Sequence, residues 1–300
     1  RNGAVAGQDT FMAYIQAPTR DNNQTKPRSQ FGGYKNMPNV TVNGVDLYYE
    51  CHGKGKPLMM IAGLASDSQS WLPIVEDLSR HHLLILPDNR GVGRTKPQDV
   101  ETSIHHMADD CITLIKHLGL SSVHLLGHSM GGFVALDCAI RYPECVSTLM
   151  LAATSAFNPE RNKALFYDWV LHLMAGMNLE LWFRNIFYWI FSRRFFENKA
   201  SLDAAIRFAL EYPYPQTAVA FEKQVEAANT FDCRESLASI RQKTLIICGK
   251  EDLLFPPEES IRALKAIPET GVAFIEDAAH SIHMENPRAF TDCVLRLLSN

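Results

Sequence analysis

Short apolar runs alternate with longer segments of helical periodicity along most of the chain. Residues 58–62, 83–86 and 123–126 form runs of a strand's length with few polar interruptions. Residues 105–118 place apolar side chains three and four positions apart, which predicts a helix with one buried face. This alternation predicts a mostly parallel central sheet that is flanked by helices and buried on both faces.

The pattern starts with a hairpin and continues to the end of the chain. The dipeptide Asn43-Gly44, which favours a two-residue hairpin turn, joins the β-rich runs 40–42 and 45–48. Further strands and helices follow in alternation. The strands are predicted at 146–152, 244–248 and 272–275, and the helices at 72–78, 131–141, 257–266 and 287–298.

The alternation stops between residues 157 and 232, where the composition is helical and rich in aromatic side chains. The strand–helix rhythm resumes afterwards. One sheet domain at 39–156 and 233–300, interrupted by a helical cap at 157–232, explains this pattern better than two serial domains. Residues 1–38 carry no core-forming period, and we expect them to form a flexible N-terminal leader.

The composition is that of a globular protein. Hydrophobic residues make up 46% of the chain and charged residues 21%, so apolar material suffices for a core and bulk disorder is excluded. A count of 29 Lys and Arg against 33 Asp and Glu gives a net charge of −4, which argues against a nucleic-acid partner. No apolar run approaches the roughly 18–20 residues that a transmembrane segment needs.

Two features of the sequence bear on the cellular compartment. The N-terminal residues contain no apolar stretch of the kind that a secretory signal has. The seven cysteines are scattered, odd in number and never spaced as Cys-x-x-Cys, which is typical of reduced thiols. We therefore expect a cytoplasmic protein.

The sharpest motif is the G-x-S-x-G pattern at 127–131, between a predicted strand and a predicted helix. A serine on so tight a turn needs small residues two positions away on each side, because larger side chains would collide as the backbone folds back. Gly127 and Gly131 meet this need. The motif therefore predicts Ser129 as a nucleophile that is lifted clear of the sheet.

With Ser129 in this context, the sequence resembles the α/β-hydrolases over residues 40–298. Further motifs match that family in order. Ile-Ala-Gly-Leu at 61–64 resembles the oxyanion loop, and Asp-Asn-Arg-Gly-Val-Gly at 88–93 resembles the turn that supports the nucleophile. Gly-Lys-Glu-Asp at 249–252 and Ala-Ala-His at 278–280 stand where the family keeps its acid and its base. The resemblance implies an α/β-hydrolase fold with an inserted helical cap.

A serine hydroxyl needs a neighbouring base, and the base needs a carboxylate that orients it. Asp252 follows a predicted strand by a short turn, on the same rim of the sheet as Ser129, and Glu251 beside it is the alternative. His280 follows the last predicted strand and completes the family's order of serine, acid and histidine, with His283 as the alternative base. The predicted catalytic residues are therefore Ser129, Asp252 and His280.

Two backbone N–H groups are expected to stabilise the oxyanion of such a reaction. The resemblance assigns them to Met130, directly after the nucleophile, and to Leu64 in the early loop. The sequence departs from the family pattern at Ala62, where a histidine is usual, and at Ala279, where a glycine often precedes the base. Neither departure removes a reacting group, but both leave the loop geometry open.

The aromatic insertion predicts an apolar roof over the site. The candidate pocket residues are His128, Trp182, Phe187, Leu254 and Ile282. An apolar roof favours an uncharged, partly hydrophobic small molecule as substrate. No cofactor or metal is expected, because the chain has no His-Glu-x-x-His pattern and Lys96 stands where a dinucleotide motif would need its third glycine.

These residues predict a serine hydrolase that cleaves a carboxylic ester or a lactone through an acyl-enzyme on Ser129. A C–C bond hydrolase and a perhydrolase of the same fold are alternatives, whereas epoxide and haloalkane hydrolases are excluded because they use an aspartate nucleophile. Outside enzymes, the alternative is a small-molecule receptor or signalling protein with slow or no turnover. The aromatic stretch 182–196 also leaves an interfacial, lipase-like role open.

Overall fold

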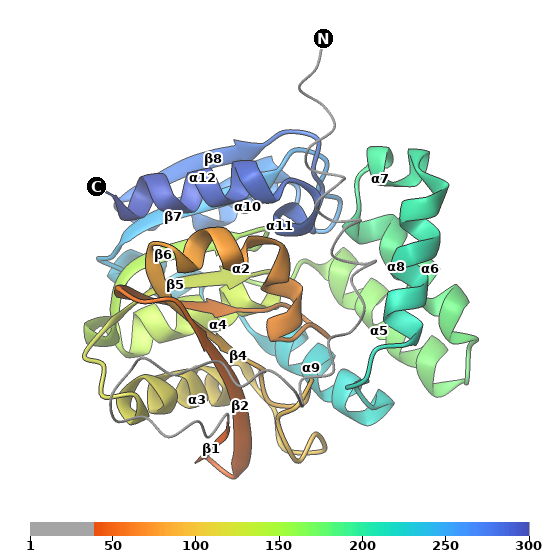
Figure 1. Ribbon diagram of the computed structural model, residues 1–300, viewed down its shortest axis with the longest axis horizontal. Helices are drawn as coiled ribbons and strands as arrows, with labels where there is room; N and C mark the ends of the chain where they lie inside the picture. Colours follow the sequence, from red (N-terminus) through yellow and green to blue (C-terminus); the bar gives the residue numbers. More distant parts are fainter. Residues whose placement is uncertain (1–38, 300) are drawn as a thin grey trace.

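The computed structural model describes residues 39–299, and the predicted leader at 1–38 lies outside the described residues. Its strands are β1 (Asn39–Val42), β2 (Val45–His52), β3 (Lys56–Ile61), β4 (His82–Pro87), β5 (Val123–His128), β6 (Val146–Ala152), β7 (Lys243–Gly249) and β8 (Thr270–Ile275). They form one sheet in the order β1-β2-β4-β3-β5-β6-β7-β8 (Figure 1). The pairs β1–β2 and β2–β4 are antiparallel and all others are parallel, which confirms the mostly parallel sheet.

Helices cover both faces of this sheet. Those packed on it are α2 (Leu72–Ser79), α3 (Ile104–His117), α4 (Met130–Arg141), α10 (Pro257–Leu264), α11 (Ile282–Glu285) and α12 (Pro287–Leu298). Helices α3 and α4 share one core with Met59 and Ile61 of β3, and α2 and α12 share the other with Leu58 and Met60. Side chains alternate between the faces of a strand, so a strand buried on both faces appears in the sequence as one apolar run.

The first two strands are joined by the predicted turn. Asn43 and Gly44 have φ values of 43° and 82°, which a two-residue turn between twisted strands requires. Asn43 Nδ2 also donates to Asp110 Oδ1 of α3 at 2.9 Å. Asp110 in turn forms a buried ion pair with Arg90 at 2.7 Å, so the hairpin is tied to the turn at 88–93.

Between β6 and β7 the chain leaves the sheet and forms five α-helices. They are α5 (Glu160–Met174), α6 (Leu179–Ile190), α7 (Arg193–Glu197), α8 (Lys199–Leu210) and α9 (Ala218–Thr230). Figure 1 shows α5 to α8, coloured green to cyan, standing together at one side of the sheet. We call residues 157–232 the helical insertion, and an antiparallel bridge between Phe157 and Asp232 joins its two ends.

Aromatic side chains make up much of the core of the helical insertion. The rings of Phe166 and Trp169 stack with centroids 5.0 Å apart. The indole N–H of Trp182 donates to Trp169 O at 2.9 Å, and that of Trp169 donates to Asn185 Oδ1 at 2.8 Å. The indole N–H groups of these two buried tryptophans therefore both have acceptors, and the hydrogen bonds hold α5 against α6. None of the described helices is long and apolar enough to cross a bilayer.

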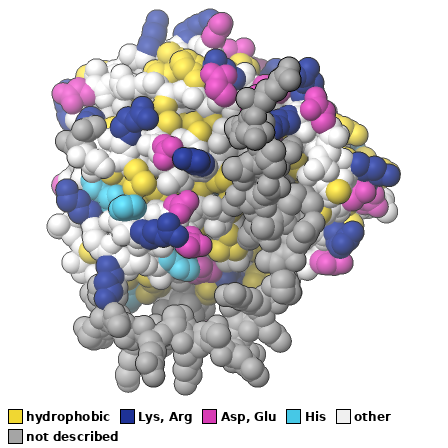
Figure 2. All heavy atoms as spheres, turned by 45° about the horizontal axis from the view of Figure 1, so that its top comes forward, with side chains coloured by type: hydrophobic (Ala, Val, Ile, Leu, Met, Phe, Trp, Pro, Cys, Tyr) yellow, Lys and Arg dark blue, Asp and Glu magenta, His cyan; other side chains and the backbone are white. Residues whose placement is uncertain are grey.

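Most charged side chains lie at the surface, where both signs are mixed over the visible part of the face in Figure 2. Such mixing leaves no extended field of one sign on that part. Two arginines instead reach carboxylates away from the surface: Arg90 forms a buried pair with Asp110 at 2.7 Å, and the partly buried Arg94 pairs with Asp88 at 3.1 Å. Both lie at or beside the turn at 88–93, which is therefore held by charge-assisted hydrogen bonds.

Candidate active site

Ser129 occupies a strained turn between β5 and α4. Its backbone has φ 54° and ψ −122°, a conformation that residues with a side chain rarely adopt. Three hydrogen bonds hold it there: the Ser129 N–H donates to Ala152 O at 2.9 Å, and Ser129 O accepts from Gly132 N and from Thr154 Oγ1, both at 2.8 Å. The turn therefore presents the serine side chain in one fixed direction.

Neighbouring backbone atoms explain why the motif has a glycine on each side of Ser129. A Cβ atom on Gly127 would lie 2.2 Å from Gly131 O, and a Cβ atom on Gly131 would lie 2.1 Å from Ile61 O. Both distances are far inside van der Waals contact. The collision that the sequence predicts for larger residues is thus confirmed, and its second partner is the end of β3.

His280 and Asp252 lie beside each other in the loops after β8 and β7. His280 Nδ1 is 3.0 Å from Asp252 Oδ2, and the Asp252 side chain is completely buried. The other carboxylate oxygen, Oδ1, accepts the N–H groups of Leu254 at 2.8 Å and Phe255 at 2.9 Å. Because the backbone holds one oxygen, the second is aimed at the imidazole.

The alternative acid and base point elsewhere. Glu251 Oε2 accepts the N–H of Arg193 at 3.1 Å, so this carboxylate contacts the helical insertion. His283 is buried behind the site, with its ring centroid 4.7 Å from that of His128. Burial lowers the pKa of His283 to about 3, so its ring is neutral at neutral pH. The geometry pairs neither of them with the His280 ring.

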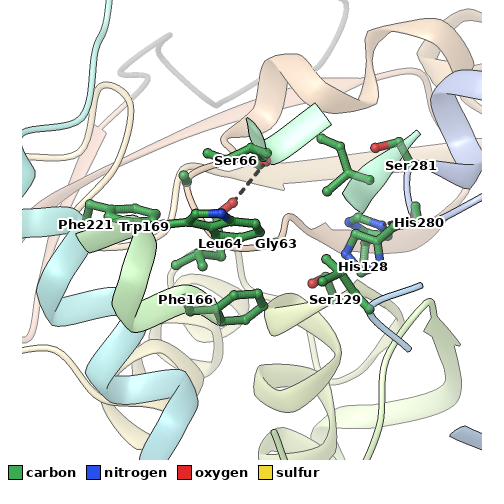
Figure 3. Close-up of a pocket in the computed structure, with 14 residues that line it drawn as sticks. Gly63, Leu64, Ser66, His128, Ser129, Phe166, Trp169, Phe221, His280 and Ser281 are labelled. Carbon is green, nitrogen blue, oxygen red and sulfur yellow. Dashed lines mark hydrogen bonds between the residues drawn. The ribbon is translucent and has the colours of Figure 1, made fainter. Parts of the chain in front are cut away.

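A cavity of about 90 Å³ lies between the ends of the strands and the helical insertion (Figure 3). Ser129 and His280 line one side, and Leu64 borders it from the loop after β3. The insertion supplies apolar side chains to the rest of the wall. These are Phe166, Trp169, Ile186, Ile190 and Phe221. Among the described residues, no Asp, Glu, Lys or Arg lines the cavity.

Two of the five predicted pocket residues, His128 and Leu254, line this cavity. The other three belong to the surrounding cores. Trp182 packs in the larger core, Phe187 in an apolar cluster within the helical insertion, and Ile282 in the core on the opposite face of the sheet. None of these three residues lines this cavity. Helical spacing, on which Trp182 depended, marks buried positions without separating core from pocket.

The two predicted oxyanion donors flank Ser129. Leu64 lines the cavity, and Met130 is the first residue of α4. The first N–H groups of a helix have no acceptor within the helix and carry partial positive charge. Gly63 brings the early loop against the nucleophile, since a Cβ atom there would lie 3.0 Å from Ser129 Cβ. The early loop therefore approaches Ser129 closely at Gly63, although Ala62 stands where the family usually has a histidine.

His128 contacts the base loop directly. Its Nε2 is 2.9 Å from His280 O, so Nε2 carries the hydrogen and Nδ1 is left as an acceptor. Burial, together with the neighbouring His283 and His280 rings, lowers the pKa of His128 well below its ordinary value. Although three imidazoles meet here, residues 39–299 contain no group of three or more His, Cys, Asp or Glu arranged to hold a metal ion.

The loop that carries His280 is fastened to the helical insertion through Glu285. This carboxylate accepts the Ala279 N–H at 2.8 Å through Oε2 and the Ser192 N–H at 2.9 Å through Oε1. Burial raises the pKa of Glu285 to about 7, against the lowering effect of these two hydrogen bonds. Sequence reasoning missed Glu285, because no motif marks a contact between residues 93 positions apart.

This fold and this site have a counterpart among known families. Residues 56–287 match the family described as alpha/beta hydrolase fold. The chain belongs to the α/β-hydrolase family. Among curated proteins, the “Putative carbamate hydrolase RutD” of Azorhizobium caulinodans is 29% identical to this α/β-hydrolase over 261 residues, which cover 86% of this chain and 97% of the relative. The protein of the same name from Agrobacterium fabrum is 26% identical, with 84% and 98% covered.

Solved structures share the same fold with this α/β-hydrolase. The enol-lactonase from Burkholderia xenovorans LB400 has a TM-score of 0.79 at 22% identity, with 88% of this chain and 100% of the other covered. A thermophilic esterase from Thermogutta terrifontis has a TM-score of 0.76 at 25% identity, with 88% and 97% covered. Both likenesses show the fold, since 88% of this chain is covered in each comparison.

Proposed function

We propose that this α/β-hydrolase is a serine hydrolase that cleaves a carboxylic ester or a lactone through an acyl-enzyme on Ser129. One observation carries the proposal: Ser129 and His280 line the same cavity, and Asp252 bonds to the Nδ1 side of the same imidazole. A hydroxyl, an imidazole and a buried carboxylate in this relation are the groups that nucleophilic acyl transfer requires.

The hydrogen bond to Asp252 sets the tautomer of His280. Nδ1 carries the hydrogen that points to Oδ2, which leaves Nε2 as the base that takes the proton of Ser129 while Oγ attacks the substrate carbonyl. The N–H groups of Leu64 and Met130 stabilise the oxyanion. His280 then gives its proton to the leaving alcohol, and a water molecule that it activates releases the acyl group.

The cavity supports a small, uncharged acyl group. Its volume of about 90 Å³ is smaller than the roughly 150 Å³ of a buried cavity that holds the six carbons of benzene, so about four carbons fill it. An unpaired charge would be costly there, because no Asp, Glu, Lys or Arg within residues 39–299 lines the wall. The helical insertion then acts as a cap whose apolar side chains set the length of the acyl group.

The direct test compares hydrolysis of p-nitrophenyl butyrate and labelling by a fluorophosphonate in the wild-type protein, Ser129→Ala and Ser281→Ala. Ser281 lines the same cavity, so its variant is a matched control that removes a different hydroxyl. We expect Ser129→Ala to lose labelling and about 10³-fold or more of the activity, and Ser281→Ala to keep both. Full esterase activity in Ser129→Ala would refute the proposal.

Carbamate hydrolysis is a second candidate, which the similarity to relatives named as carbamate hydrolases favours. Ester and carbamate carbonyls are attacked by the same nucleophile and stabilised by the same oxyanion donors. The two are separated by comparing kcat/KM for a short ester, a lactone and an N-unsubstituted carbamate, with ammonia release as the readout for the last. A labelled Ser129 without turnover of any of them would favour a receptor role.

A further inference from the structure

One buried amide from the helical insertion contacts both the loop after β3 and the turn at 88–93. Gln224 lies on α9 and is completely buried. Its Oε1 accepts the Ala65 N–H at 3.1 Å, and its Nε2 donates to Arg90 O at 2.9 Å. Phe221, one turn earlier on the same helix, lines the cavity. Helix α9 therefore supplies a wall of the cavity and a polar contact to the loop beside it.

The contact with Ala65 holds the loop that provides an oxyanion donor. Ala65 has φ 56°, which a residue with a side chain adopts only where its surroundings hold it. Its N–H belongs to the Leu64–Ala65 peptide, and the carbonyl of that same peptide accepts Ser66 Oγ at 3.3 Å (Figure 3). Hydrogen bonds at both edges fix this peptide plane, and the Leu64 N–H belongs to the peptide immediately before it.

The contact with Arg90 joins the amide to a rigid part of the fold. The Arg90 guanidinium makes two hydrogen bonds of 2.7 Å with the buried carboxylate of Asp110. Because Ala65 offers a backbone donor and Arg90 a backbone acceptor, the amide of Gln224 has one orientation that satisfies both. Gln216 adds a third contact, since its Nε2 donates to Gln224 Oε1 at 3.0 Å and to Gly91 O at 2.8 Å.

We propose that Gln224 is a positioning residue for the oxyanion hole. It holds the Leu64–Ala65 peptide so that the Leu64 N–H stays directed at the place where negative charge develops. The active arrangement of the early loop then depends on α9 being seated against it. This inference rests on the proposed serine hydrolase function and adds a residue to it that no motif marks.

The experiment compares Gln224→Met with the neighbouring Lys223→Met on a short activated ester. Methionine preserves the volume of glutamine without its amide, whereas the side chain of Lys223 pairs with Asp99 at the surface. We expect kcat of Gln224→Met to fall about tenfold or more with KM changed less than about threefold. The affinity for a short trifluoromethyl ketone, which forms an oxyanion on the serine, should fall by a similar factor as kcat/KM.

The variant Gln224→Glu gives a second, independent readout. A protonated carboxyl accepts from Ala65 N and donates to Arg90 O, as the amide does, whereas an ionised carboxylate has no hydrogen to donate. We therefore expect its kcat, relative to that of the wild-type protein, to fall as the pH rises. A merely structural role for Gln224 predicts a change in melting temperature without this trend.

The outcomes separate the two proposals. If Ser129→Ala loses activity while folded Gln224→Met keeps kcat within about twofold of Lys223→Met, the positioning role is overturned and the proposed function stands. If Gln224→Met does not fold, a pH-independent ratio of Gln224→Glu to wild-type activity overturns the role. Activity that survives in Ser129→Ala overturns the proposed function and this role together.

Discussion

Asp252 contacts His280 through one carboxylate oxygen, with Oδ2 at 3.0 Å from His280 Nδ1. Its other oxygen, Oδ1, accepts two backbone N–H groups at 2.8 and 2.9 Å. The carboxylate therefore cannot rotate without losing hydrogen bonds inside a buried loop, where an unmade bond is costly. The orientation of the imidazole thus follows from the backbone after β7 rather than from contacts with the cavity.

Replacing Asp252 by asparagine should reveal this role. The amide keeps the size of the carboxylate but can present an N–H to His280, which favours the wrong tautomer of the ring and removes the charge that stabilises its cation. We expect kcat for p-nitrophenyl butyrate to fall by about 10³–10⁴-fold, with near-native circular dichroism. Glu251→Gln is the adjacent control and should stay within about twofold, and an equal loss in both variants would contradict the assignment of Asp252.

Phe166 is expected to limit the length of the acyl chain, because its ring forms part of the apolar wall. In the wild-type protein, kcat/KM should be higher for p-nitrophenyl butyrate than for the octanoate. Phe166→Ala enlarges the cavity, and each further methylene that it buries contributes about 0.8 kcal/mol. The octanoate-to-butyrate ratio should therefore rise about tenfold or more.

Tyr167 provides the control for this prediction, since it is adjacent on α5 and its side chain is 55% exposed. Tyr167→Ala should leave the ratio of octanoate to butyrate hydrolysis unchanged. An unchanged ratio in Phe166→Ala as well would show that the cavity wall does not select the substrate.

Glu285 should make the stability of the protein depend on pH. Its pKa is about 7 in the folded state against an ordinary value of 4.5. Between these values the folded state binds more protons than the unfolded state, so the free energy of unfolding contributed by this group falls as the pH rises. Over this window the loss amounts to about 3 kcal/mol, and it is absent in Glu285→Gln.

Urea unfolding at several pH values between 4.5 and 7.5 measures the effect as the difference between the wild-type protein and Glu285→Gln. Titrating groups that do not interact with Glu285 contribute equally to both proteins and cancel in that difference, and Glu251 is the group that interacts with it. Glu276→Gln is the control, because Glu276 is an exposed glutamate paired with Lys250. Parallel curves for the wild-type protein and Glu285→Gln would show that the buried carboxyl titrates as it does in the unfolded chain.

Replacement by alanine should destabilise the protein strongly at Gly131 and only weakly, if at all, at Gly271. A Cβ atom on Gly131 would collide with Ile61 O at 2.1 Å, whereas the nearest atom to a Cβ atom on Gly271 is Leu245 Cδ1 at 3.5 Å. We expect Gly131→Ala to lose about 3 kcal/mol or more of unfolding free energy, or to fail to fold, and Gly271→Ala to change by less than about 1 kcal/mol. Equal stability of the two variants in urea would rule out the close approach of α4 to β3.

Local patterns explain why much of the sheet domain could be predicted. A strand buried on both faces must be apolar along its length, so β3, β5 and β7 appear directly in the sequence. The turn at Ser129 is equally local, because its steric requirement falls on residues two positions away. The acid and base candidates each follow a strand by a short loop, so the sequence points to Asp252 and His280, whose side chains lie 3.0 Å apart.

Contacts between distant segments could not be predicted in the same way. Residues of the helical insertion that face the cavity share their spacing with core residues, so the sequence points to Trp182 although Phe166 and Phe221 line the cavity. The side chains of Gln224 and Glu285 bond to backbone N–H groups, and every residue type except proline has such a group, so the sequence does not mark their partners. Helix α11 has four residues, too few to show a helical period. The cytoplasmic location and the leader at 1–38 stay predictions.

The two ends of the helical insertion lie next to each other, so the segment can be replaced without disturbing the sheet domain. Phe157 and Asp232 form an antiparallel bridge, and the Cys233 N–H donates to Ala156 O at 3.0 Å. Segments with adjacent ends can be lengthened, shortened or replaced without changing the span that the host domain must bridge. Changes within residues 157–232 can therefore alter the substrate range while the reacting groups stay in place. Each replacement of this segment must still place an amide side chain where Gln224 lies.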